Sequence, residues 1–215
     1  RYLRDEEGEK EVTIELGHLF WQDIGDFERA EEFFNRLKLL DRTHPAMVAF
    51  YEAHYAKQKQ WRKLFTFLSS QQRRVDDIDD AIEIARRLSD IAENRMKSSE
   101  RAIGVWKDVL RQHPDNQSAA EQLERLYEEH SKWHALADYL ENEVDRLGED
   151  QQEATLKTLE KLVPVYRDRL EHNSKLINTL RRILEVDAGH QTAFQELRKH
   201  LKEKGRWADL AELLQ

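Results

Sequence analysis

Histidine and acidic side chains are abundant in this sequence, but their spacing does not assemble a metal or catalytic site. Of the nine histidines, His130 and His134 lie four residues apart, as in a zinc pair. Ser131–Lys132 between them is typical of a turn between helices, so the two rings would not share the helix face that such a pair requires. The acidic run at residues 76–80 lacks the glycine and the final glutamate of a calcium loop. Its place where a helix begins favours capping of free backbone N–H groups.

Nucleophiles and phosphate-binding motifs are missing as well. The sequence contains no cysteine, which excludes disulfides, thiolate zinc sites and a cysteine nucleophile. It contains none of the motifs GxGxxG, GxxxxGKS/T, HExxH and GxSxG, which mark phosphate cradles, zinc proteases and nucleophile elbows. We therefore expect a noncatalytic chain that binds no cofactor and no metal.

The charge balance limits the classes of partner. The 35 Lys and Arg residues face 43 Asp and Glu residues, which gives a net charge of -8 with neutral histidine. A nucleic-acid interface needs a concentrated surplus of basic residues, and no such stripe is visible, so we expect no direct nucleic-acid contact. No apolar run approaches the ~20 residues of a membrane helix. We expect no membrane insertion, with the cytoplasm as the default location.

A long internal period determines the predicted fold. Only 7 Gly and 3 Pro occur in 215 residues, so tight turns are scarce and most β-rich folds are excluded. Trp61, Trp133 and Trp207 recur at intervals of 72 and 74 residues, and apolar residues around them align in the same register. The aligned sets are Phe34, Trp106 and Leu180; Leu37, Val109 and Ile183; Tyr51, Leu123 and Leu197; Tyr55, Tyr127 and Leu201; and Leu64, Leu136 and Leu210.

Each long period divides into two units of about 36 residues, and each unit has the apolar spacing of two amphipathic helices. Short links make the two helices antiparallel, and helices this short bury their apolar faces only by stacking on the next pair. The sequence predicts one all-α repeat domain over residues 1–215, an α-solenoid of about six antiparallel helix pairs. The predicted units are 8–42, 43–75, 76–114, 115–148, 149–187 and 188–215.

These repeats resemble the tetratricopeptide family. Gly25–Asp26 followed by Ala30 and Phe34 is similar to the family's second-helix signature, and Leu16–Gly17 with Phe20 is similar to its first-helix signature. First helices of the odd units are about one residue longer than the family's. The resemblance implies a superhelix whose first helices line a concave groove that takes an extended or helical peptide.

The first-helix signature, mapped along the chain, gives candidate groove residues of mixed sign, with more cations toward the C-terminal half. The Lys and two Asn with which family members clamp a terminal carboxylate are not visible, which disfavours that ligand. The candidates are His18, Trp21, Arg86, Asp90, Asn94, Glu121, Arg125, Glu128, Lys157, Arg167, Gln195, Lys199 and Lys202.

Other conspicuous residues have structural explanations. The three repeating tryptophans are expected at the starts of second helices, covering the preceding turn. The aromatic group at residues 50–55 has helical spacing and is expected in the core. Pro164 lies inside an otherwise helical run and should kink or divide it because it lacks the N–H donor.

The sequence predicts a noncatalytic scaffold or adaptor that binds a peptide or protein partner in the groove, within a larger bacterial assembly. Two rival functions remain open: an RNA-processing scaffold of the half-repeat type, and a regulatory segment of a larger enzyme. The last helix is truncated relative to its counterpart in the preceding period. We therefore expect either a segment of a longer protein, which we favour, or self-association through that C-terminal end.

Overall fold

The computed structural model describes residues 6–148 and 150–214, and the regular elements within these residues are helices, with no strand. Residues 149 and 215, where two predicted units begin and end, lie outside the described part of the chain. No described helix combines the length and apolar character that spanning a membrane requires. The chain forms two compact units, one ending at Leu126 and the other beginning at Tyr127. The all-α class predicted from the sequence is confirmed.

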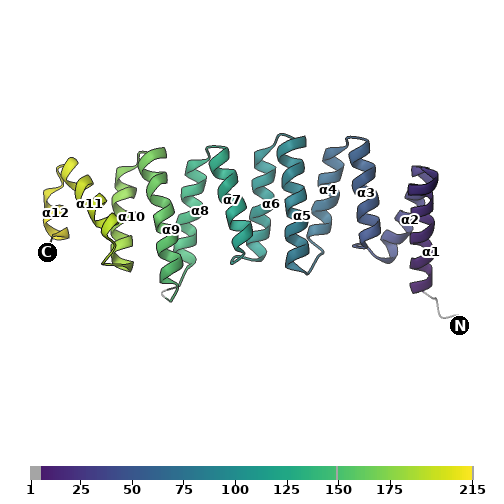
Figure 1. Cartoon of the computed structure of the whole chain (residues 1–215), viewed down its shortest axis with the longest axis horizontal. Helices are drawn as coiled ribbons and strands as arrows, with labels where there is room; N and C mark the ends of the chain where they lie inside the picture. Colours follow the sequence, from purple (N-terminus) through teal and green to yellow (C-terminus); the bar gives the residue numbers. More distant parts are fainter. Residues whose placement is uncertain (1–5, 149, 215) are drawn as a thin grey trace. The chain divides into compact units, whose positions relative to one another are not determined.

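In the first unit, antiparallel helices follow one another side by side (Figure 1). The last of them, α7, contains the boundary between the two units. The elements are α1 (Glu6–His18), the π-helical segment η1 (Leu19–Ile24), α2 (Phe27–Leu40), α3 (Pro45–Lys57), α4 (Trp61–Gln72), α5 (Ile78–Asp90), the π-helical segment η2 (Ile91–Arg95), α6 (Ser99–Gln112) and α7 (Gln117–Glu129).

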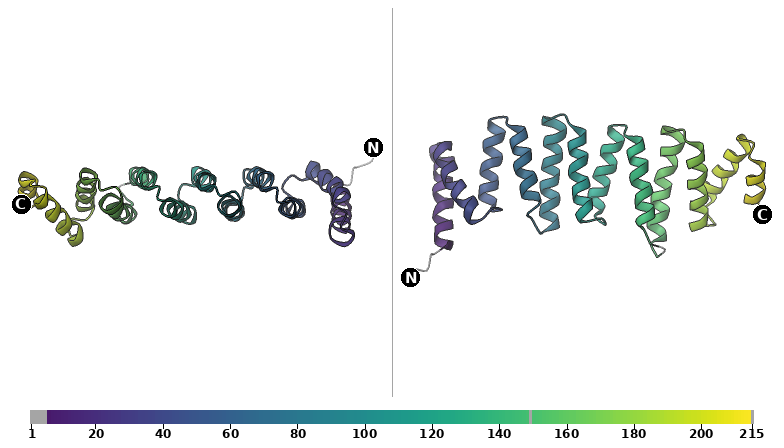
Figure 2. Two further views of the ribbon diagram at one scale, coloured as in Figure 1. Left: turned by 90° about the horizontal axis from the view of Figure 1, so that it is seen from above. Right: turned by 180° about the vertical axis from the view of Figure 1, so that it is seen from behind.

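The second unit continues the same pattern of antiparallel helices. Its elements are α8 (Trp133–Arg146), α9 (Gln152–Pro164), the π-helical segment η3 (Val165–Arg169), α10 (Asn173–Val186), α11 (Gln191–Glu203) and α12 (Trp207–Leu213). Within each unit, neighbouring helices alternate between two layers (Figure 2). This arrangement of stacked helix pairs is the all-α solenoid that the repeat period predicts.

The aligned apolar positions of the repeat form the core. In the first unit the rings of Phe34 and Phe50 stack with their centroids 4.3 Å apart. Phe50 and Tyr51 are buried while His54 and Tyr55 are half-buried, so the aromatic group at residues 50–55 is core, as predicted. Each large apolar side chain buried in this way contributes about 1.5–3 kcal/mol. In the second unit the same role falls to buried aliphatic residues, among them Leu136, Leu159, Leu176, Leu180, Ile183 and Leu197.

One residue with positive φ closes the turn between the two helices of every pair. The backbone dihedral φ there lies between 50° and 75°, in the left-handed region that normally favours glycine. Four of these six residues carry a side chain and therefore hold a strained backbone. The six are Gly25, Lys59, Lys97, Ser131, Glu171 and Gly205.

The π-helical segments accommodate the extra residue of the odd units. In η2 and η3, N–H groups bond to the carbonyl five residues back, as from Met96 to Ile91 and from Leu170 to Val165. The segments η1, η2 and η3 recur in step with the long period, so the insertion is a regular part of the repeat. Pro164 ends α9 directly before η3, but η1 and η2 form without a proline, so the proline is not the cause of the π-helical turn.

Acidic side chains cap two of the helices. Asp26 accepts a hydrogen bond from the N–H of Arg29 at 3.1 Å, at the start of α2. Asp77 accepts from the N–H groups of Asp79 and Asp80 at 2.9 and 3.1 Å, at the start of α5. The capping explanation of the acidic run at residues 76–80 is therefore confirmed for Asp77.

The repeating tryptophans open second helices, as predicted: α4, α8 and α12 begin with Trp61, Trp133 and Trp207. Trp61 and Trp133 are half-buried, and a guanidinium group lies over each ring. The carbon Cζ of Arg95 is 5.1 Å from the Trp61 ring centroid, and that of Arg169 is 4.6 Å from the Trp133 ring centroid. Trp207 is 62% exposed. The tryptophan–arginine stack is thus a repeated feature that holds one pair against the next.

Ion pairs between helices contribute less to stability than apolar burial does. The Arg36 guanidinium contacts Glu9 at 2.7 Å, and the Lys175 ammonium contacts Glu141 at 2.7 Å. Burial alone would raise the pKa of Glu141, but hydrogen bonds from Lys175 and Tyr166 outweigh it and lower the pKa of that carboxyl. Because these side chains are partly exposed, each pair contributes about 1 kcal/mol or less. Apolar burial therefore provides most of the stability.

Glycine at position 17 is required by a close helix approach. A Cβ added at Gly17 would lie 2.9 Å from Cζ of Phe34, a fully buried ring, whereas a Cβ at Gly104 in α6 meets no atom within 4 Å. Gly17→Ala should lower the free energy of unfolding by about 1–3 kcal/mol. Gly104→Ala should raise it by about 0.5–1 kcal/mol, since alanine favours the helix. Urea denaturation of both variants tests the close approach of Gly17 to Phe34. Equal changes in the free energy of unfolding would contradict it.

The strained turns give a second prediction. Lys97 is exposed and has φ 53°, so Lys97→Gly should relieve left-handed strain and raise the free energy of unfolding by about 0.5–1 kcal/mol. The matched control is Lys107→Gly in the interior of α6, which should lower it by about 1 kcal/mol. Thermal unfolding of the two variants distinguishes them, and a destabilised Lys97→Gly protein would show that the turn is not strained.

Candidate functional site

The first helices of the first unit form a small hollow of about 260 Å³. Elements α5, η2 and α7 provide most of its lining, and α6 contributes one ring from below. Four of the lining residues are ones that the sequence predicts for the groove: Arg86, Asp90, Asn94 and Arg125. The other four are Ser89, Glu93, Trp106 and Gln122. The structure therefore brings part of the predicted set together, on the layer of first helices.

A buried hydrogen-bond chain organises the floor of this hollow. Ser89 is 4% exposed, and its Oγ accepts a hydrogen bond from Nε1 of the buried Trp106 at 3.1 Å. The same hydroxyl donates to Oε1 of Glu93 at 2.9 Å. Because a buried indole N–H needs a partner, Ser89 links the core ring to the carboxylate that faces the hollow.

Side chains on the two first helices connect across the hollow. Nη2 of Arg125 on α7 lies 3.2 Å from Oε1 of Glu93 on η2. Nη2 of Arg86 on α5 lies 3.5 Å from Oγ of Ser118 on α7. Asn94 donates to Asp90 at 2.7 Å within the same first helix. The Arg125 and Glu93 side chains are 37% and 19% exposed, so their pairing contributes little stability but fixes the direction of both groups.

Three further candidates of the first unit lie outside this hollow. His18 and Trp21 stack with ring centroids 5.7 Å apart, and the Trp21 ring meets Phe50 edge-on at 5.6 Å. Both are half-buried and pack with the aromatic core of the first two helix pairs. Glu121 on α7 is exposed and accepts a hydrogen bond from Gln117 at 2.9 Å.

In the second unit, Arg167 links two first helices in a similar way. Its Nη1 lies 2.9 Å from Oε1 of Glu196, which connects η3 to α11, and its Nη2 lies 2.8 Å from Oδ2 of Asp168. Hydrogen bonds to Asp168 and Glu196 raise the pKa of Arg167, so this cation stays charged. This first-helix contact parallels that of Arg125 and Glu93 in the other unit.

The remaining candidates of the second unit are spread over exposed helix surface. Lys157 pairs with Glu153 at 2.6 Å, one turn away on α9, and Lys199 approaches Glu203 at 4.0 Å on α11. The hydrogen bond from Lys157 lowers the pKa of Glu153 and raises that of Lys157. The other candidates, all exposed, are Glu128, Gln195 and Lys202.

The chemistry available in the hollow is hydrogen bonding and ion pairing. Its groups are a hydroxyl, two amides, two guanidiniums and two carboxylates, which suits peptide main chain and polar side chains. Within residues 6–148 and 150–214, no group of three or more histidine, aspartate or glutamate residues is placed to hold a metal ion.

The sequence analysis did not place Ser89, Glu93, Trp106 and Gln122 in the groove. Trp106 belongs to a second helix, and mapping first helices alone leaves it out. Glu93 lies four residues after Ser89, on the same helical face, and this spacing was the available signal. The register of η2 could not be predicted because a π-helical turn displaces the following side chains.

Gly17 of the first-helix signature lies against Phe34 of the second-helix signature, inside one antiparallel pair. This pairing agrees with the resemblance to tetratricopeptide repeats that the sequence shows. No protein-family model matches the sequence, and no curated protein matches it.

Several solved helical structures are similar to this chain, two of them described as tetratricopeptide repeat (TPR) proteins or domains. A chain of Naa15/Naa10 bound to HypK-THB is 12% identical with a TM-score of 0.49, over 95% of this chain and 30% of that one. YrrB, described as a TPR protein with an unusual peptide-binding site, is 12% identical with a TM-score of 0.37, over 86% and 89% of the chains. The TPR2AB domain of yeast Sti1, in its pHSP90 complex, is 14% identical with a TM-score of 0.38, over 95% and 88%.

This chain spans 30% of the length of the Naa15/Naa10 chain that it matches.

The Ser89 link can be tested by a double-mutant cycle. Ser89→Ala should lower the free energy of unfolding by about 1–3 kcal/mol, because the buried N–H of Trp106 loses its acceptor. In a Trp106→Phe background the same change should cost distinctly less, since phenylalanine has no N–H to satisfy. Urea denaturation of the parent, the two single variants and the double variant gives the coupling free energy between Ser89 and Trp106. Strictly additive effects on the free energy of unfolding would contradict the hydrogen bond between them.

Proposed function

We propose that this chain is a noncatalytic interaction scaffold that binds a protein or peptide partner on the layer of its first helices. The hollow lined by Arg86, Asp90, Asn94 and Arg125 is the observation that carries the proposal. It combines exposed polar side chains from two successive first helices with a floor fixed by Ser89, so a ligand meets groups that are already oriented. Preoriented groups lose less side-chain freedom on binding.

The mixed charge of the hollow favours a polypeptide partner. Arg86 and Arg125 offer guanidinium donors beside the carboxylates of Asp90 and Glu93, and the amide of Asn94 both donates and accepts. A peptide main chain also alternates donors and acceptors, so it can be held along such a surface. A uniform anion such as a nucleic-acid backbone would meet the two carboxylates, and we exclude it from this surface.

The noncatalytic part of the proposal rests on the absence of a nucleophile–base pair in the hollow. Among the described residues, Ser89 supplies the only hydroxyl that lines it, and this side chain is 4% exposed and already bonded to Trp106 and Glu93. A serine nucleophile needs an accessible oxygen and an adjacent base that takes its proton, and no histidine lines the hollow. Its groups are therefore arranged to hold a ligand.

Site-specific photo-cross-linking in extracts of the source organism tests the binding surface. A photoreactive amino acid at Asn94 should cross-link a discrete partner, whereas the same group at the exposed Lys107 on the second helix α6 should not. Arg86→Glu should reduce the Asn94 cross-link at least tenfold, because it replaces a charge-assisted donor by a repelling carboxylate.

Arg111→Glu on α6 is the matched control, since it reverses an exposed charge away from the hollow. It should leave the Asn94 cross-link unchanged. Cross-links from Lys107 that equal those from Asn94, or an Arg86→Glu protein with undiminished capture, would refute the assignment of this surface.

A further inference from the structure

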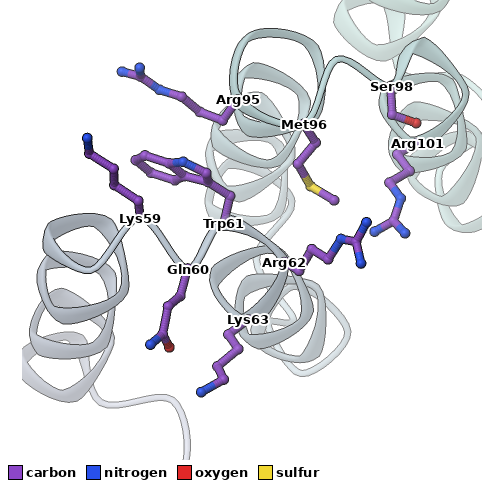
Figure 3. Close-up of a pocket in the computed structure, with 9 residues that line it drawn as sticks. All are labelled: Lys59, Gln60, Trp61, Arg62, Lys63, Arg95, Met96, Ser98 and Arg101. Carbon is purple, nitrogen blue, oxygen red and sulfur yellow. The ribbon is translucent and has the colours of Figure 1, made fainter.

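A second hollow in the first unit is strongly cationic. It encloses about 680 Å³ where the turn before α4, the first turn of α4, the end of η2 and the first turn of α6 meet. Trp61 lines it together with five cations, Lys59, Arg62, Lys63, Arg95 and Arg101, and no aspartate or glutamate is among its lining residues (Figure 3). It involves none of the residues of the hollow at Ser89.

These five cations have no carboxylate partner in the described part of the chain. Two of them lie over aromatic rings, Arg95 over Trp61 at 5.1 Å and Arg101 over Phe65 at 5.6 Å. Elsewhere the chain pairs its arginines readily, as between Arg87 and Glu52 at 2.9 Å. In a protein with 43 acidic residues and a net charge of -8, five unpaired cations in one hollow repel one another, and a bound anion would relieve that repulsion.

The arginines are also arranged to share one ligand. Figure 3 shows the guanidinium groups of Arg62 from α4 and Arg101 from α6 pointing toward one another, while Lys59 and Arg95 lie on either side of the Trp61 ring. Two guanidinium forks from different helices match the oxygens of a tetrahedral anion. The first turns of α4 and α6 add uncapped N–H groups at the same place, since neither N-cap residue makes a side-chain cap bond.

The second unit provides an internal comparison. There the tryptophan–arginine stack recurs as Trp133 and Arg169, at 4.6 Å. Three of the five cations do not recur, because Ser131, His134 and Ala135 stand at the positions of Lys59, Arg62 and Lys63. Lys175, at the position of Arg101, pairs with Glu141 at 2.7 Å. The stack therefore suffices for the repeat, and the unpaired cations of the first unit are an addition that the fold does not need.

We propose that this hollow binds a phosphate monoester on a short segment of the protein partner, such as a phosphoserine. This inference deepens the proposed function and rests on it for the source of the phosphate. A phosphate monoester carries a charge of about -1.5 to -2 and three acceptor oxygens, so it suits the facing guanidinium groups of Arg62 and Arg101, with further cations nearby, better than a single carboxylate does.

A phosphorylated peptide fits this chain better than RNA does. The net charge of -8 repels a long polyanion, whereas a short segment meets mainly the local cations. Single-stranded nucleic acid also relies on bases stacking on open aromatic faces, and Arg95 lies over the Trp61 ring.

Indole N–H signals in nitrogen-15 NMR of the full chain provide the test. The probe is a short phosphoserine peptide; its unphosphorylated form and its serine-to-glutamate form are the comparisons. Trp61→Phe assigns the Trp61 signal. The phosphopeptide should shift the Trp61 signal and leave that of Trp133 in place, and both comparison peptides should bind at least tenfold more weakly.

Charge variants then test the two arginines. The double variant Arg62→Gln with Arg101→Gln should weaken phosphopeptide binding at least tenfold. The matched control, Arg73→Gln with Arg74→Gln, removes two exposed cations about 18 Å away, beyond the far end of α4, and should change binding less than twofold. Both double variants should keep the helical circular dichroism of the parent.

Three results would overturn the inference: no Trp61 shift at millimolar phosphopeptide, equal binding of the glutamate peptide, or a single-stranded RNA that binds more tightly than the phosphopeptide. Binding of a partner at the hollow around Asn94 is tested separately, by the cross-linking experiment, because the peptide titration does not require a ligand at Asn94. If the Trp61 signal does not shift but Asn94 gives specific cross-links, the phosphate site is refuted and the proposed scaffold function is retained.

Discussion

Burial of one apolar face of each helix against the next helix is the interaction on which the rest of this structure depends. The helices are short, at 7–14 residues for the α-helical elements, and isolated helices of this length are marginal in water. Phe34, Trp106 and Leu180 occupy the same place in successive long periods, and each is 0–1% exposed. The hydrophobic contact between neighbours is therefore what selects the fold, and ion pairs such as Arg36 with Glu9 only adjust it.

Stacking of this kind leaves the outer surface of each layer free to vary. The turn geometry is repeated because every pair needs one left-handed residue, even where that residue is Lys97 or Glu171. The tryptophan–arginine stack is repeated as well, at Trp61 and Trp133. The polar hollow around Ser89 and the cationic hollow around Arg62 are additions to this scaffold. The exposed groups of these hollows are the surfaces that we propose for function, whereas Ser89 and Trp106 beneath one of them also belong to the buried core.

Much of the fold could be predicted from the sequence, because the apolar period is long and regular. The helix starts at Trp61, Trp133 and Trp207 and the cap at Asp77 follow directly from residue type and spacing. The candidate sites were harder to predict from the sequence. The first-helix pattern named Arg86, Asp90, Asn94 and Arg125, which the structure brings into one hollow. It did not name Ser89, which is buried on α5, or Glu93, which lies on the π-helical segment η2. The cationic hollow was missed because its residues come from two segments about 34 residues apart, so no basic run appears in the sequence.

Native-state hydrogen exchange of Phe34→Ala is the most direct test of stacking between neighbours. Phe34 is fully buried and touches the rings of Phe50 and Trp21 in the first two helix pairs. If stability is transmitted only between adjacent pairs, the variant should lose amide protection in α1 to α4 and keep the protection of α9 to α11. Equal loss of protection in every helix would contradict the account, because it would mean that the chain unfolds as one globular core.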